Sequence, residues 1–145
     1  MLSFREMEKY CQLLQVIQGH QQQIAQYDDT LRAYDYRSGP RSSNVHADLI
    51  GEILAKKEIF LDKLPKLEAL AASRRSNVER TINTAVAAAE RKDQLRTALI
   101  FKMRYNSAHS WEEIANILGK ESAKAIRDRV IQCIEKGAEI NGRIE

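Results

Sequence analysis

Basic and hydroxyl side chains are concentrated in the stretch 119–129, and their chemistry suits an anionic partner. Four side chains in this stretch are basic and two are acidic, which gives a local net charge of +2. Lysine and arginine donate to phosphate oxygens, and arginine also pairs with base edges in the major groove of DNA. A charged helix face can equally be solvated without binding anything. The candidate DNA contacts in this stretch are Lys120, Ser122, Lys124, Arg127 and Arg129.

Two short helices joined by a tight turn are expected to position these side chains. Ser110 is a good helix N-cap, and Glu113, three residues later, completes a capping box. Gly119 stands where the first helix should end, because glycine adopts the left-handed conformation easily. Ser122 can cap the second helix. Apolar residues recur at three- and four-residue intervals on both sides of the turn: Trp111, Ile114, Ala115, Leu118, Ile126, Val130, Cys133 and Ile134. This pattern indicates a helix-turn-helix, and the alternative is an ordinary helical hairpin without a nucleic-acid role.

The segment 95–136 resembles the DNA-binding region 4 of bacterial sigma factors. The similarity lies in Leu99, Arg104 and Tyr105, in Ser-Trp-Glu-Glu-Ile-Ala at 110–115, in Leu118-Gly119, and in Ile-Arg-Asp-Arg-Val at 126–130. With a long helical part before it, this ending is similar to the small phage late-transcription regulators of the ArpU and RinA type. The turn between Gly119 and Ile126 is one residue longer than in that pattern, which leaves the start of the second helix open.

The resemblance implies a phage or prophage transcription regulator that binds double-stranded DNA, with RNA polymerase as a further partner. We expect the helix from Ser122 to enter the major groove, and Arg104 and Ser110 to hold the flanking phosphate backbone. Two other functions are compatible with the sequence. One is a phage DNA-packaging subunit of the small-terminase type, and the other is a helical adaptor that contacts a protein.

Charge is distributed unevenly along the 145 residues. Residues 1–73 carry a net charge of −1 and residues 74–136 a net charge of +5, so the positive charge coincides with the candidate motif. No phosphate-binding glycine loop, catalytic motif or metal-ligand spacing is present, and we expect no enzymatic activity, cofactor or metal. Cys11 and Cys133 are expected to be buried thiols. No apolar run approaches the ~20 residues that span a membrane, and no signal-peptide pattern is found, so a cytoplasmic protein is expected.

The N-terminal part is expected to form two long antiparallel helices. A seven-residue repeat runs through Tyr10, Ile17, Ile24 and Leu31, and Leu13, His20, Tyr27 and Tyr34 follow each of them by three residues. This is a coiled-coil-like seam. The loop 35–44, which includes Arg37 and Arg41, should lead to a second helix over 45–64. Pro65 should kink or break that helix.

The predicted protein is all-α, with a long N-terminal helical hairpin followed by a small C-terminal helix-turn-helix domain. We expect residues 1–89 to form the hairpin and connector and to assemble a homo-oligomer, and residues 90–145 to bind DNA. Within the second domain, Leu95, Leu99 and Met103 should give the helix 91–105 a broad apolar face. Gly137 should end the last helix, and residues 138–145 should form a mobile tail.

Overall fold

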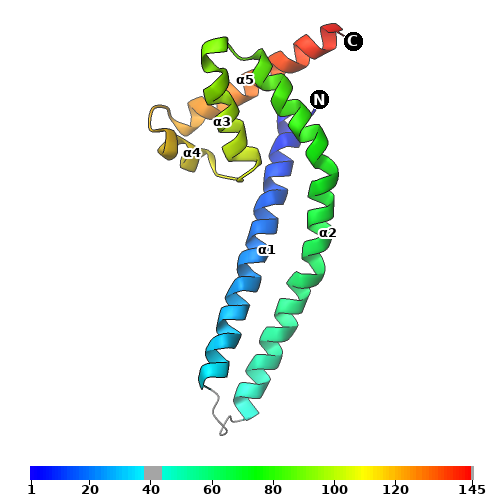
Figure 1. Cartoon of the computed structure of the whole chain (residues 1–145), viewed down its shortest axis with the longest axis vertical. Helices are drawn as coiled ribbons and strands as arrows, with labels where there is room; N and C mark the ends of the chain where they lie inside the picture. The colour runs from blue at the N-terminus through cyan, green and yellow to red at the C-terminus, as the bar shows by residue number, and fades with distance from the viewer. Residues whose placement is uncertain (38–43, 145) are drawn as a thin grey trace. The chain divides into compact units, whose positions relative to one another are not determined.

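The computed structural model describes residues 1–37 and 44–144, with side-chain surroundings for residues 1–34 and 47–142. The described part is helical and contains no strand, which confirms the all-α class. The helices are α1 (Phe4–Arg37), α2 (Asn44–Ala88), α3 (Gln94–Tyr105), α4 (Trp111–Leu118) and α5 (Ala123–Ile144), and a short 3₁₀ turn, η1 (Arg91–Asp93), precedes α3 (Figure 1). Most of the loop predicted over 35–44, with Arg41, lies outside the described residues, as does the side chain of Arg37. None of the described helices is long and apolar enough to cross a membrane.

The chain forms two compact units, and their boundary differs from the predicted division at residue 89. One unit combines Met1–Gln15 with Ala71–Glu145, and the other is Val16–Leu70. The reason is that the ends of α1 and α2 complete the core around α3, α4 and α5. Met7 and Cys11 of α1 and Val78, Thr81 and Ala85 of α2 are all buried. They accompany the buried side chains of the last three helices, the largest of which are Tyr105, Phe101, Ile100, Ile114, Ile126 and Val130.

The N-terminus is fastened to this core. Ser3 caps α1, because its hydroxyl accepts a hydrogen bond of 3.2 Å from the backbone N–H of Glu6. The backbone N–H of Leu2 donates to the hydroxyl of Thr81 on α2 at 2.8 Å. These contacts fix the start of α1 beside the C-terminal half of α2 within the same unit.

The helix α2 continues through Pro65, where the sequence predicts a kink or break with a separate connector after it. A proline inside a helix removes one backbone hydrogen bond and crowds the carbonyl four residues earlier. A long helix can tolerate that loss when the residues on both sides favour helix and pack. Alanine and leucine dominate the segment after Pro65, and both are strong helix formers.

Gly137 lies inside α5 and does not end it, so the expected end of the last helix is wrong and residues 138–144 continue the helix. A Cβ atom at this position would lie 3.3 Å from the backbone of Ala85 and 2.9 Å from Cε of Met1. Gly137 is therefore used for close approach of α5 to α2, and its helix-ending tendency is overridden by packing. The expected apolar face of α3 is also only partly buried. Met103 is buried, whereas Leu95 is 86% exposed and Leu99 is 47% exposed.

In the Val16–Leu70 unit, the segments of α1 and α2 contact each other through aromatic rings. The ring of His20 meets the ring of Phe60 edge-on with centroids 4.9 Å apart, and Tyr27 lies 6.0 Å from the same ring. Lys57 forms an ion pair of 2.5 Å with Asp28. Two residues of the predicted seven-residue repeat, His20 and Tyr27, thus contact α2.

Candidate nucleic-acid interface

Three residues fix the start of α4, the end of α4 and the start of α5. The Ser110 hydroxyl accepts from the backbone N–H of Glu113 at 3.1 Å, which caps α4. Gly119 adopts φ 71°, and its N–H donates to the carbonyl of Ala115 at 2.8 Å. The Ser122 hydroxyl accepts from the N–H of Ala125 at 3.1 Å, so α5 begins with a capped first turn. These three caps agree with the prediction, and α5 starts at Ala123.

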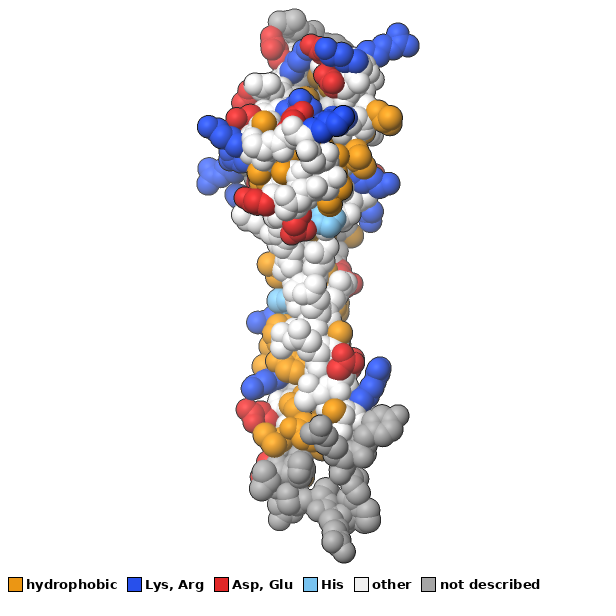
Figure 2. Space-filling view, turned by 90° about the vertical axis from the view of Figure 1, so that its left-hand side faces the viewer, with side chains coloured by type: hydrophobic (Ala, Val, Ile, Leu, Met, Phe, Trp, Pro, Cys, Tyr) orange, Lys and Arg blue, Asp and Glu red, His pale blue; other side chains and the backbone are white. Residues whose placement is uncertain are grey.

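Three of the predicted contact residues are exposed: Lys120 in the turn, and Lys124 and Arg127 on α5. The two on α5 are three residues apart, a spacing that places their side chains on one side of the helix. Within the described part of the chain, neither lysine forms an ion pair. The guanidinium of Arg127 lies 5.3 Å from the ring centroid of Phe4 on α1. The charged group itself therefore lies against the ring, although Arg127 as a whole remains exposed. We call Lys120, Ser122, Lys124 and Arg127 the basic surface, and Figure 2 views the side of the molecule that carries α4 and α5.

A shallow hollow adjoins the basic surface at the turn. It is lined by residues of α4 and of the turn, namely Glu112, Ala115, Asn116, Gly119, Lys120, Glu121, Ser122 and Ala123, and measures about 480 Å³. The exposed Ser122 hydroxyl uses its oxygen to accept from Ala125 and keeps its proton for another acceptor. The first backbone N–H groups of α5 point to the same end of the helix. An anionic oxygen at this end would meet a hydroxyl donor and a helix dipole.

Arg129 is engaged within the protein and is not part of the basic surface. Its guanidinium lies 2.7 Å from the carboxylate of Glu121, which is also 3.5 Å from Arg96 of α3. Arg129 and Glu121 are one-third exposed or less, so the pair is partly shielded from solvent. The carboxylate of Glu121 therefore fastens the turn to both α3 and α5.

Arg104 was predicted to contact phosphate, but the structure places it in the interior. It is 7% exposed and forms an ion pair with Glu8 of α1. A second hydrogen bond runs from its Nη1 to the carbonyl oxygen of His109 at 2.9 Å, and its guanidinium stacks 4.5 Å from the centroid of Trp111. Burial opposes the charge on Arg104, but the hydrogen bond and charge of Glu8 outweigh this and raise the pKa of Arg104. Arg104 is thus a structural cation that joins α1, α3 and α4.

Ser110 was also predicted to hold phosphate, and its hydroxyl is already used twice. It accepts from the backbone of Glu113 and donates to the carboxylate of Glu113 at 3.2 Å. His109 contacts the other carboxylate oxygen at 2.8 Å. This hydrogen bond from His109, together with those from Ser110, lowers the pKa of Glu113. Ser110 acts as a helix cap, and the negative charge beside it disfavours phosphate.

Sequence reasoning missed three side chains that shape the site: Phe4, Glu8 and Glu121. Phe4 and Glu8 lie about a hundred positions away along the chain from the residues that they contact, and no local pattern connects them. The signal for Glu121 was weak. The turn is one residue longer than in the sigma region 4 pattern, so the sequence did not show which part of the turn Glu121 would occupy.

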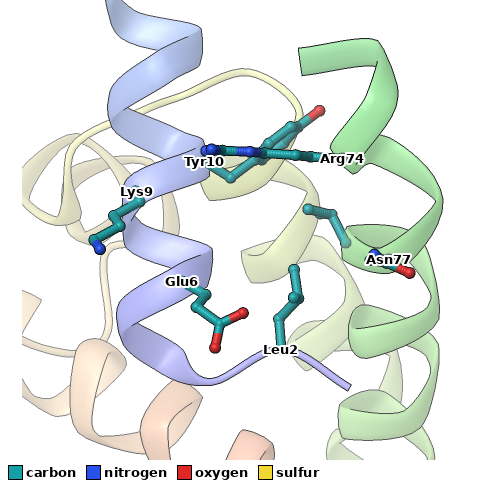
Figure 3. Close-up of a pocket in the computed structure, with 7 residues that line it drawn as sticks. Leu2, Glu6, Lys9, Tyr10, Arg74 and Asn77 are labelled. Carbon is teal, nitrogen blue, oxygen red and sulfur yellow. The ribbon is translucent and has the colours of Figure 1, made fainter. Parts of the chain in front are cut away.

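A separate hollow of about 340 Å³ lies between the start of α1 and the middle of α2 (Figure 3). Glu6, Lys9 and Tyr10 come from α1, and Arg74 and Asn77 come from α2. The lining mixes both signs of charge and does not define a ligand. In the described part of the chain no group of three or more histidine, cysteine or acidic side chains could hold a metal ion.

Comparison with known proteins gives no relationship. The chain matches no protein-family model, no curated protein and no solved structure. The function must therefore be argued from the residues and their geometry.

Proposed function

We propose that this protein binds double-stranded DNA through α4, α5 and the turn between them, as a helix-turn-helix whose second helix enters the major groove. The observation that carries the proposal is the basic surface: two exposed lysines that form no ion pair with any described residue, and one exposed arginine, all near the capped start of α5. A recognition helix presents its N-terminal residues to base edges in the same way. A role in transcription regulation rests on the resemblance to sigma region 4 and to phage regulators.

Each side chain of the basic surface has a distinct role in this proposal. Lys120 and the Ser122 hydroxyl contact phosphates at the rim of the groove, where the helix N-terminus adds favourable partial charge. Lys124 and Arg127 project from the first two turns of α5, the position from which a recognition helix contacts bases. Arg127 can donate to a guanine through two N–H groups. The ring of Phe4 restricts the arginine and so reduces the entropy lost on binding.

The test is a titration of fluorescent duplexes with the full chain. A Lys124→Ala/Arg127→Ala double variant should bind at least about tenfold more weakly, because each lost contact costs on the order of 1 kcal/mol or more. A Lys63→Ala/Lys66→Ala variant removes the same charge from an exposed part of α2 and serves as the matched control. Equal affinities for the two variants would show that the basic surface does not bind DNA.

A second candidate function is a helical adaptor that contacts a protein such as RNA polymerase. The exposed side chains of Leu95 and Leu99, one turn apart on α3, favour it, because an exposed pair of large apolar residues on one helix face is a common feature of binding surfaces. A protein without affinity for any duplex at low salt would support this function over DNA binding.

A further inference from the structure

The Val16–Leu70 unit has almost no interior of its own. Among its described side chains, at positions 16–34 and 47–70, only Ile17 is buried. The side chains between its two helices, such as Ile24, Ile53, Phe60 and Leu64, are only half-buried. Two paired helices gain most of their stability from a packed apolar stripe, and a stripe that stays half open to water contributes only part of that gain.

Two leucines of α2 lie beside the stripe and remain exposed. Leu54 is 48% exposed and Leu61 is 45% exposed. They are seven residues apart, and each directly follows a residue of the stripe, Ile53 or Phe60. This register places both leucines on one flank of the helix pair, where a further helix would cover them and the stripe together.

The matching flank of α1 is almost free of charge. The twelve residues from Val16 to Tyr27 contain no aspartate, glutamate, lysine or arginine, and Gln21 follows His20 at the position that corresponds to Leu61. The next residue on this flank, Asp28, is neutralised by Lys57. A solvated helix face normally carries charges, whereas the centre of an interface is depleted of them.

The α2 side of this flank carries two exposed glutamates, Glu58 and Glu68, beside the leucines, whereas the α1 side is uncharged from Val16 to Tyr27. A second copy of the same chain suits this division, because a two-fold axis parallel to the helices lays α2 of one copy over α1 of the other and keeps the glutamates apart. The area is also sufficient. A 19-residue helix pair is about 28 Å long and about 20 Å wide. Its face measures on the order of 560 Å² per copy. The two faces together exceed the total buried area of about 1,000 Å² that is expected of a biological interface.

We propose that the flank carrying Leu54 and Leu61 packs against the same flank of a second copy and forms a four-helix bundle. This inference does not rest on DNA binding. It names the surface through which the chain self-associates and limits the assembly to two copies, since the flank is used once per chain.

Sedimentation equilibrium of the full chain tests the proposal. The wild type should have twice the mass of one chain at micromolar concentration. The dissociation constant of a Leu61→Glu dimer should be at least about 100-fold higher, because a leucine contact is lost and an unpaired carboxylate is buried. The matched control is Ile59→Glu, which changes an outward residue of similar exposure, 53%, two positions away. This variant should remain dimeric.

A second measurement does not depend on the fold of a variant. The melting temperature of the wild-type protein should rise with concentration between about 1 and 100 µM, as mass action requires for a dimer. A wild type that is monomeric throughout this range would overturn the proposal, as would a ring of eight or more subunits. Equal dissociation of the Leu61→Glu and Ile59→Glu variants would place the interface elsewhere and contradict it.

Discussion

Glu121 and Arg129 form an ion pair of 2.7 Å that joins the turn before α5 to the second turn of that helix. The carboxylate also approaches Arg96 of α3 at 3.5 Å. The pair removes one cation from the surface that was predicted to bind DNA, and it places a negative charge beside the exposed Lys120. It therefore fixes the geometry of the turn, and in the proposed DNA-binding role it would lower the affinity for DNA.

Replacing Glu121 by glutamine should raise affinity for DNA. The change removes a charge that repels phosphate and releases Arg129, so the slope of log affinity against log salt should steepen by about 1. Asp128→Asn is the matched control, since it removes an equal charge from an exposed position on α5. An increase no larger for Glu121→Gln than for Asp128→Asn would show that Arg129 is not released. The melting temperature should also fall for Glu121→Gln and stay unchanged for Asp128→Asn.

Replacing Glu8 by alanine should destabilise the fold. Arg104 would be left buried without its carboxylate partner, and Tyr105 would lose the acceptor that its hydroxyl contacts at 2.9 Å. Loss of one member of a buried pair costs about 3 kcal/mol of unfolding free energy. Urea unfolding of Glu8→Ala, Arg104→Met and the double variant gives the coupling between them. If Arg104→Met instead left stability unchanged and weakened DNA binding, Arg104 would be a phosphate contact as first predicted.

Stability should fall above about pH 8.5. Burial raises the pKa of the Cys11 thiol to about 11, whereas an unfolded cysteine titrates near 8.5. Below pH 8 both states hold the proton and the group has no effect. Between these pKa values the unfolded chain loses its proton first, so the free energy of unfolding should decline by about 3 kcal/mol. The measurement is urea unfolding from pH 7 to 11, and Cys11→Ala should make the decline shallower.

Tyr105 should extend this decline to higher pH. Burial, followed by the charge and hydrogen bond of Glu8, raises the pKa of its hydroxyl far above the ordinary value. The unfolded tyrosine ionises near pH 10, so the loss due to this group begins there. In the same titration Tyr105→Phe should flatten the curve above pH 10 and leave the region below it unchanged. A variant curve that is parallel to the wild type above pH 10 would contradict this assignment.

Two glycines of α5 should respond oppositely to alanine. Gly142 has no atom within 4 Å of an added Cβ, so Gly142→Ala should stabilise the helix by up to about 1 kcal/mol. At Gly137 the new methyl group would press on Met1 and the backbone of Ala85. Gly137→Ala should therefore lose this gain and lower the melting temperature. A rise in melting temperature for both variants would mean that α5 does not approach α2 closely at Ala85.

The caps of the candidate site could be predicted from the sequence because capping depends on near neighbours. Ser110, Gly119 and Ser122 each act within four residues of the groups that they satisfy. The seven-residue period of α1 likewise pointed to His20 and Tyr27, which contact Phe60 of α2. These local rules were sufficient to locate α4, α5 and the exposed lysines beside the turn.

Contacts between distant segments could not be predicted in this way. The partner of Arg104 is Glu8, 96 positions earlier, and a local pattern made Arg104 look like an exposed cation. The sequence predicts a helix end at Gly137, because no local pattern shows that Ala85 of another helix lies against this glycine. The sequence predicts a kink or break at Pro65, and the break is wrong because α2 continues through it, where the flanking residues favour helix. Each of these errors concerns a case in which tertiary packing outweighs local preference.

The salt dependence of DNA binding tests the central claim most directly. Lys120 is placed at a phosphate, so Lys120→Ala should make the slope of log affinity against log salt shallower by about 0.9. The Lys124→Ala/Arg127→Ala variant removes contacts to bases and should mainly lower the affinity, while Lys63→Ala/Lys66→Ala should keep the wild-type slope and affinity. A slope that is unchanged in the first variant, or a wild type that binds no duplex at low salt, would contradict the account.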